Sequence, residues 1–136
     1  MNKFLIQVSK LSKKFENKNL VIRVLKDINL NLESGRVIAL VGPSGSGKST
    51  LLHLLALLDK PSNGKIFLDG NSTSNIDENK KNQIIRNSVS IIFQNNNLLN
   101  DFTAIENVMM PLIIKGENET NAKKEAQKIL KAVKIL

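Results

Sequence analysis

Apolar and polar residues alternate near the start of the chain, and this pattern predicts extended structure. Alternation over residues 4–8 indicates a strand, because successive side chains of a strand point to opposite faces. A turn is expected at residues 17–19. Two further strands are expected after it, at Leu20–Leu25 and over the alternating positions 28–32, with Lys26-Asp27 between them. The N-terminal part is therefore predicted to be antiparallel β-structure.

Continuous apolar runs appear further along the chain. Val37–Val41 is apolar without interruption, which is typical of a strand buried on both faces of a sheet. Val89–Phe93, which is apolar except for Ser90, is predicted to be another buried strand. A short strand at Lys65–Leu68 should be closed by the hairpin-type turn Asp69-Gly70. The segment Asn95–Asp101 is polar and is expected to be a loop.

Four segments have the pattern of helices: Ser49–Leu58, Asp77–Asn87, Thr103–Met109 and Glu119–Leu136. In the third, Thr103 as N-cap and Glu106 three residues later have the spacing of a capping box, and Pro111 should stop the helix. The last is amphipathic. The face predicted to be apolar consists of Ala122, Ala126, Ile129, Leu130 and Val133.

Composition narrows the functional classes. The 136 residues, 41% of them hydrophobic, suffice for one compact domain. The formal charge of +8 is spread along the chain, and the five Phe do not alternate with Lys to form base-stacking platforms, so nucleic acid is not the expected partner. The chain has no Cys and hence no thiolate metal site. No signal peptide is apparent, and Leu51–Leu58 is too short to cross a bilayer. We expect a cytosolic protein that a partner would hold at any membrane.

The strongest local signal is a glycine-rich loop between the apolar run at residues 37–41 and the following helix. Residues 42–50 fit the P-loop pattern G-x-x-x-x-G-K-[ST]. Glycines let successive backbone N–H groups turn toward a phosphate, and the positive end of the helix adds to the field. Lys48 would contact the outer phosphates, Ser49 would offer a hydroxyl to Mg²⁺, and Thr50 would be a further donor. The predicted phosphate-binding residues are Gly42, Pro43, Ser44, Gly45, Ser46, Gly47, Lys48, Ser49 and Thr50.

The loop and its flanks resemble the ATP-binding domain of ABC transporters. Ser-Gly-Arg-Val-Ile-Ala-Leu-Val precedes the loop at residues 34–41, with β-strands expected upstream. The family stacks an aromatic residue on adenine; by resemblance this is Phe15, where tyrosine is commoner, and Val24 would line the same pocket. ATP is therefore the implied nucleotide. The implied fold is an α/β P-loop NTPase with the ABC-type mixed sheet, an antiparallel β part and the start of a helical subdomain.

A second family feature lies at Ile91-Ile92-Phe93-Gln94, which resembles the Q-loop. In the family its Gln reaches Mg²⁺ and the attacking water and senses the transporter, so the resemblance makes Gln94 and Ser49 the expected Mg²⁺ ligands. The resemblance divides the chain into an ATP-binding core at residues 1–94 and, at residues 95–136, the Q-loop with the beginning of the helical subdomain.

Residues 98–116 and the segment Asp59–Gly64 resemble one subgroup of the family. It includes the lipoprotein-releasing ATPase subunit, the macrolide-exporter ATPase and the cell-division ABC ATPase, with lipoprotein release preferred. The resemblance covers about residues 8–136. It implies a membrane permease as partner, a second ATPase domain in a head-to-tail dimer, and a place on the inner face of the plasma membrane through the permease.

The family pattern continues beyond what this sequence contains. A Leu-Ser-Gly-Gly-Gln signature, a Walker B strand ending in Asp-Glu and a switch His would follow residue 136. Ile66–Asp69 resembles a Walker B strand but matches the early hairpin of the family instead. His53, the only histidine in the sequence, is expected to be a packing residue and not the switch His. The chain is therefore expected to bind ATP and barely hydrolyse it, and the strand before the P-loop is expected to lack sheet neighbours. A non-hydrolytic nucleotide-binding fragment or degenerate gene product stays as the alternative to an ATPase subunit, and a small P-loop kinase as a weaker one.

Overall fold

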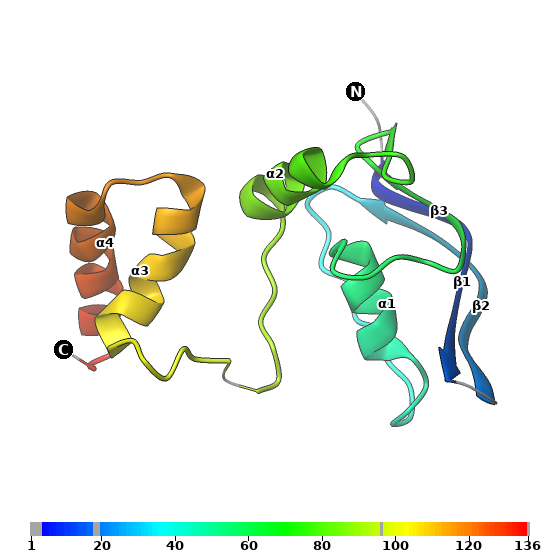
Figure 1. Cartoon of the computed structure of the whole chain (residues 1–136), viewed down its shortest axis with the longest axis horizontal. Helices are drawn as coiled ribbons and strands as arrows, with labels where there is room; N and C mark the ends of the chain where they lie inside the picture. The colour runs from blue at the N-terminus through cyan, green and yellow to red at the C-terminus, as the bar shows by residue number, and fades with distance from the viewer. Residues whose placement is uncertain (1–3, 18–19, 96, 136) are drawn as a thin grey trace. The chain divides into compact units, whose positions relative to one another are not determined.

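The computed structural model describes residues 4–17, 20–95 and 97–135. The turn predicted at residues 17–19 and the predicted helix end at Leu136 fall, wholly or in part, outside the described residues. The chain divides into two compact units, Met1–Ile85 and Arg86–Leu136. Figure 1 gives the order of their elements along the chain.

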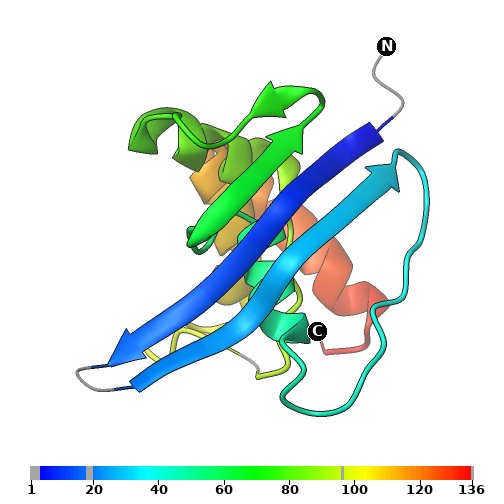
Figure 2. The ribbon, with the colours of Figure 1, turned by 90° about the vertical axis from the view of Figure 1, so that its right-hand side faces the viewer.

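The first unit is built on an antiparallel sheet. Its two long strands, β1 (Phe4–Asn17) and β2 (Leu20–Glu33), pair side by side, and β3 (Asn63–Leu68) pairs with the other edge of β1. The two-residue β4 (Asn71–Ser72) follows β3 through the predicted turn, so the expected hairpin is confirmed. The resulting order, β2-β1-β3-β4, can be followed in Figure 2.

The prediction of two strands between residues 20 and 32 is wrong, because β2 runs through both. Asp27 adopts a left-handed backbone with φ 49°, and the pairing with β1 shifts register nearby. The Ser12 hydroxyl accepts a bond from the Asp27 N–H at 3.0 Å and donates to its carboxylate at 3.2 Å. Lys26-Asp27 is therefore an irregularity within β2 that is hydrogen-bonded to β1. The chain continues through it in the same direction, so it does not end the strand.

Helix α1 (Lys48–Leu55) covers one face of this sheet, as Figure 2 shows. The core between them consists of Val8, Leu11, Leu25, Leu51, Leu54 and Ile66. The helix ends three residues before the predicted Leu58, since Leu57 turns to a left-handed backbone with φ 60°. The glycine-rich loop thus leads into a helix whose apolar side is buried against β1, β2 and β3.

The two strands predicted from continuous apolar runs do not form. Residues 37–41 and 89–93 belong to no helix or strand. Val37 is 102% exposed and Val41 84%, and Ile92 in the second run is 100% exposed. A strand buried on both faces needs a strand on each side, and within the described residues neither run has one.

Helix α2 (Glu78–Ser88) lies one residue from its predicted bounds and carries the chain from the first unit into the second. In α3 (Ala104–Lys115) the predicted capping box is present: the Thr103 side chain accepts from the Glu106 N–H, and Glu106 accepts from the Thr103 N–H at 2.8 Å. Pro111 does not stop α3, contrary to the prediction. It costs one backbone hydrogen bond, while the capping box and the left-handed C-cap Gly116 hold both ends.

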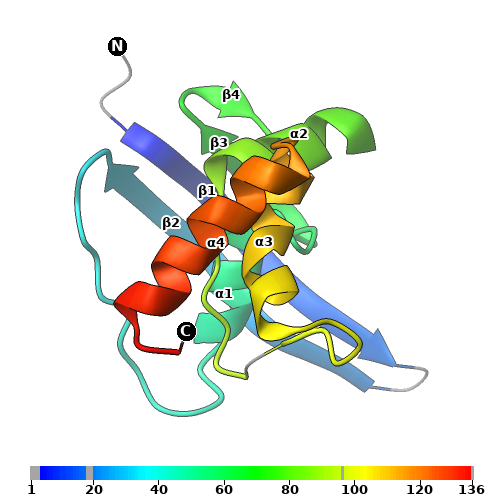
Figure 3. The same cartoon turned by 90° about the vertical axis from the view of Figure 1, so that its left-hand side faces the viewer.

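The last helix, α4 (Glu119–Ala132), is shorter than predicted and packs against α3 (Figure 3). Ala122, Ala126 and Leu130 are buried, and the first two pack with Met109. Ile129 and Val133, predicted on the same face, are 52% and 58% exposed. Small alanines let the two helices approach closely, while Ile129 and Val133 stay more than half exposed. None of the helices described is long and apolar enough to cross a membrane.

Candidate functional site

The P-loop forms an open turn that feeds directly into α1. Inside the loop the Ser46 N–H donates to the Pro43 carbonyl at 3.3 Å, and the first helical bond runs from the Leu51 N–H to the Gly47 carbonyl at 2.9 Å. The N–H groups of residues 48–50 precede that bond, so they have no partner inside the helix. They are donors of the kind that a phosphate accepts at a helix N-terminus.

Gly47 fixes the junction between loop and helix. Its backbone is left-handed, with φ 89°. A Cβ at this position would lie 2.9 Å from the Leu25 side chain, 3.0 Å from the Val24 side chain and 3.1 Å from the Val24 carbonyl. Only glycine satisfies both the backbone angle and this approach. The loop is therefore seated on β2.

Lys48 folds back across the loop. Its ammonium donates to the carbonyls of Gly42 at 2.8 Å and Pro43 at 2.7 Å. A lysine ammonium has three N–H donors, so these two bonds fix its direction without using all of its capacity. The positive charge is held at the loop itself, next to the start of α1.

The electrostatic surroundings of the loop favour an anion. The first turn of α1 contains no acidic residue, so no carboxylate offsets the positive end of the helix. The hydroxyl of Ser49 lies in that first turn on an exposed residue, and Thr50 beside it is half-buried. A hydroxyl oxygen is a suitable ligand for Mg²⁺ when phosphate oxygens supply others. Among the residues described, no group of three His, Asp or Glu side chains could hold a metal by itself.

The two residues predicted to contact adenine lie on neighbouring strands. Val24 is half-buried on β2 and backs Gly47. Phe15 lies on β1 opposite Ile22 and is 47% exposed. The Lys13 ammonium lies 4.9 Å from the centroid of the Phe15 ring, within the range of a cation–π interaction.

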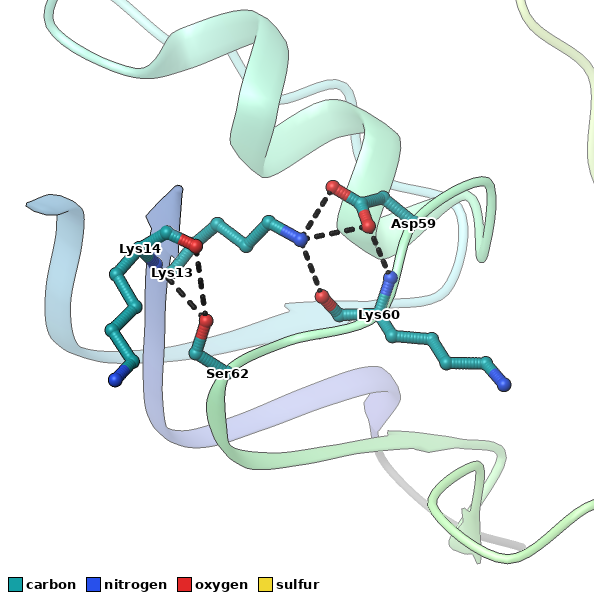
Figure 4. A network of polar contacts seen from close by, with 5 residues as sticks. All are labelled: Lys13, Lys14, Asp59, Lys60 and Ser62. Atoms are coloured by element: carbon teal, nitrogen blue, oxygen red, sulfur yellow. Dashed lines mark hydrogen bonds and ion pairs between the residues drawn. The ribbon is translucent and has the colours of Figure 1, made fainter. Parts of the chain in front are cut away.

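Sequence reasoning missed the ion pair that fixes this lysine. Lys13 contacts both carboxylate oxygens of Asp59, at 2.8 and 2.7 Å, and donates to the Lys60 carbonyl at 2.8 Å (Figure 4). The hydrogen bond from Lys13, with help from the Lys60 N–H, lowers the pKa of Asp59 below its ordinary value. The Ser62 hydroxyl accepts a hydrogen bond from the backbone N–H of Lys14 on β1 and donates one to the Lys14 carbonyl. No local signal could have revealed this, because 46 residues separate Lys13 and Asp59.

Gln94 lies in the second compact unit, in a bend, and is exposed. The P-loop belongs to the first unit. The structure thus assembles the residues of the P-loop with Val24 in one place, and the assignment of Gln94 to the metal stays a prediction.

Comparison with known proteins gives a consistent result. The family model described as ABC transporter matches residues 25–136. The lipoprotein-releasing system ATP-binding protein LolD of Rickettsia bellii is 47% identical over 131 residues, and that of Bordetella pertussis 40% identical over 128 residues. These alignments cover 96% and 94% of this chain but 57% and 55% of the relatives, so the chain spans little more than half of their length.

Solved structures agree. The ATP-binding cassette MJ0796, in a dimeric post-hydrolysis state bound to ADP and Pi, superimposes with a TM-score of 0.85 at 35% identity, covering 93% of this chain and 56% of that one. The expected α/β fold of ABC ATPase cassettes is thereby confirmed. The family model matches residues 25–136, and within that range the P-loop lies against β2. This chain therefore belongs to the ABC transporter family.

Proposed function

We propose that the chain is the N-terminal part of the ATP-binding subunit of an ABC transporter of the lipoprotein-releasing type. In the whole protein, ATP binding and hydrolysis would be coupled to substrate movement by a membrane permease. The observation that carries the proposal is the P-loop, in which the carbonyls of Gly42 and Pro43 hold the Lys48 ammonium at the loop, and α1 begins at Lys48 with no acidic residue in its first turn. The 47% identity to a LolD protein supports the subgroup.

Each predicted residue has a distinct part in the proposed site. The backbone of residues 42–50 and the Lys48 ammonium bind the phosphates. Phe15 stacks on adenine, and Val24 lines the base pocket while holding Gly47 in place. Ser49 and Gln94 are the proposed ligands of Mg²⁺, which would neutralise charge on the phosphate oxygens when bound.

The proposed partners follow from the relatives. A permease would hold the subunit at the inner face of the plasma membrane, and a second ATPase domain would complete a head-to-tail dimer; the solved relative MJ0796 is itself dimeric. We assign residues 1–94 to the ATP-binding core and residues 95–136 to the Q-loop and the beginning of the helical subdomain.

Binding of a fluorescent ATP analogue to the purified chain, with and without Mg²⁺, tests the proposal. Saturable binding that strengthens with Mg²⁺ is expected, with a loss of at least tenfold in Lys48→Ala because one charged phosphate contact is removed. Lys128→Ala is the matched control: it removes an exposed ammonium paired with Glu125 on α4 and should bind as the wild type does. Equal binding by Lys48→Ala would contradict the phosphate assignment.

Measurement of hydrolysis separates the two candidate descriptions of the chain. Turnover above the rate of Lys48→Ala would make the chain itself an ATPase. Binding without turnover would make it the non-hydrolytic nucleotide-binding module that the sequence offered as the alternative. Co-purification with a lipoprotein-releasing permease, beside a macrolide-exporter permease as control, tests the subgroup.

A further inference from the structure

Lys13 has surroundings that an ordinary surface lysine lacks. Its side chain is only 11% exposed, although it lies on β1 between half-buried and exposed residues. Its ammonium has three neighbours at once: the Asp59 carboxylate, the Lys60 carbonyl and the face of the Phe15 ring. The next residue, Lys14, forms a pair with Glu16 in which both side chains are more than half exposed.

The segment after α1 holds the Lys13 ammonium in place. Asp59 is itself oriented by the Lys60 N–H, at 2.7 Å, and the Ser62 N–H donates to the Ser12 carbonyl at 2.9 Å. Figure 4 shows the contacts of Lys13 with Asp59 and Lys60, and of Ser62 with Lys14, which join β1 to the segment after α1. We call Lys13, Asp59 and Lys60 the clamp. The charge is therefore fixed in direction, so its distance of 4.9 Å from the ring centroid is a built feature of the fold.

A cation fixed against one face of an aromatic ring affects what the ring can do with its other face. It covers the near face and draws π-electron density toward itself. The far face then becomes a better surface for an electron-rich planar partner. Phe15, 47% exposed, retains surface for such a partner.

We infer that Lys13, clamped by Asp59 and the Lys60 carbonyl, is a positioning residue that orients and polarises Phe15 as the platform for the nucleotide base. The inference rests on the proposed function, since it deepens the assignment of Phe15 to adenine. According to this inference, Lys13 and Asp59 contribute to recognition of the base and do not contact the phosphates.

Affinities for ATP and for inorganic tripolyphosphate, each with Mg²⁺, test the inference when measured by competition against the fluorescent analogue. The ratio of the two affinities isolates what the nucleoside contributes. In Lys13→Met, which keeps most of the length of the side chain without its charge, we expect the ratio to fall about fourfold. Tripolyphosphate should bind unchanged. Lys13→Arg should restore most of the ratio, because it keeps a cation, and Lys14→Met is the control that should leave it intact.

A double-mutant cycle with Phe15→Ala excludes a merely structural role. If Lys13 acts through the ring, Lys13→Met has no further effect on the ratio once Phe15 is gone. A scaffold role would instead weaken ATP and tripolyphosphate alike, and would persist in Phe15→Ala; either result overturns the inference. Circular dichroism melts of each variant identify any loss of fold.

The outcomes separate this inference from the function beneath it. A ratio that falls in Phe15→Ala but not in Lys13→Met leaves the proposed function standing and refutes the role of Lys13. A ratio unaffected by Phe15→Ala refutes the base platform, and the inference with it. A chain that binds neither ligand refutes both.

Discussion

The two flanks of the P-loop are both apolar in sequence, yet only the helix flank contains buried residues. On the helix side, Leu51 is 7% exposed and Leu54 fully buried. On the other side, Val37 and Val41 are 102% and 84% exposed. Helix α1 packs on strands that the chain itself supplies before and after it, whereas the described residues offer residues 37–41 no strand to pair with. An apolar pattern thus predicts burial only where the chain supplies a partner.

The largest expected loss of stability comes from a substitution in the buried helix flank. Leu54→Ala should destabilise the first unit by about 3 kcal/mol, because it removes buried methyl groups and leaves a cavity in the core between α1 and the sheet. Val41→Ala on the other flank should cost less than about 0.5 kcal/mol. Urea unfolding followed by circular dichroism measures both, since the chain has no Trp or Tyr for fluorescence. Equal costs would show that Val41 is buried in solution.

A smaller effect concerns the junction between the flanks. Gly47→Ala should cost about 2 kcal/mol, since it combines a left-handed backbone with contacts to Leu25 and Val24. Gly45→Ala is the matched control: its φ of 78° carries a similar conformational cost, but nothing lies within 4 Å of an added Cβ. It should therefore cost about 1 kcal/mol. If the two variants melt alike, the loop is not seated on β2.

The smallest effect is a pH dependence of the clamp at the end of α1. Lys13, the Lys60 N–H and His53 all favour the ionised form of Asp59, so its pKa is lowered in the folded chain. The stability that it contributes is then fully present above its unfolded pKa of about 3.9 and is lost as pH falls through the lower folded value. Thermal melts between pH 3 and 6 should show this loss, and Asp59→Asn should reduce it. An unchanged profile in Asp59→Asn would contradict the pair.

Local signals in the sequence were enough for much of the molecule. The glycine-rich motif, the capping box at Thr103 and the Asp69-Gly70 turn each need only a few consecutive residues, and the structure contains all three elements. Family resemblance was also sufficient to predict the fold, which the solved relatives confirm.

The features that the sequence did not predict correctly depend on residues that are distant along the chain. The runs at residues 37–41 and 89–93 were predicted as strands from their hydrophobicity, and neither is a strand. The sequence had also led us to expect that the run before the P-loop would lack sheet neighbours, and among the described residues it has none. The pair between Lys13 and Asp59, and the contact of Gly47 with Leu25, join residues more than 20 positions apart, so no periodicity reports them. The break assigned to Lys26-Asp27 and the stop assigned to Pro111 were overridden by cross-strand pairing and by strong helix caps.

Amide hydrogen exchange with and without ATP-Mg²⁺ tests the central claim most directly, because it reports on the P-loop and on the exposed flank before it in one experiment. The account predicts that ATP-Mg²⁺ slows exchange of the backbone N–H groups of residues 42–50, other than Pro43, which has none, because these groups bind phosphate. Residues 37–41 should exchange rapidly in both conditions. Unchanged exchange at residues 42–50 would show that the loop does not bind nucleotide in this chain. Slow exchange at residues 37–41 without nucleotide would show that this flank is paired after all.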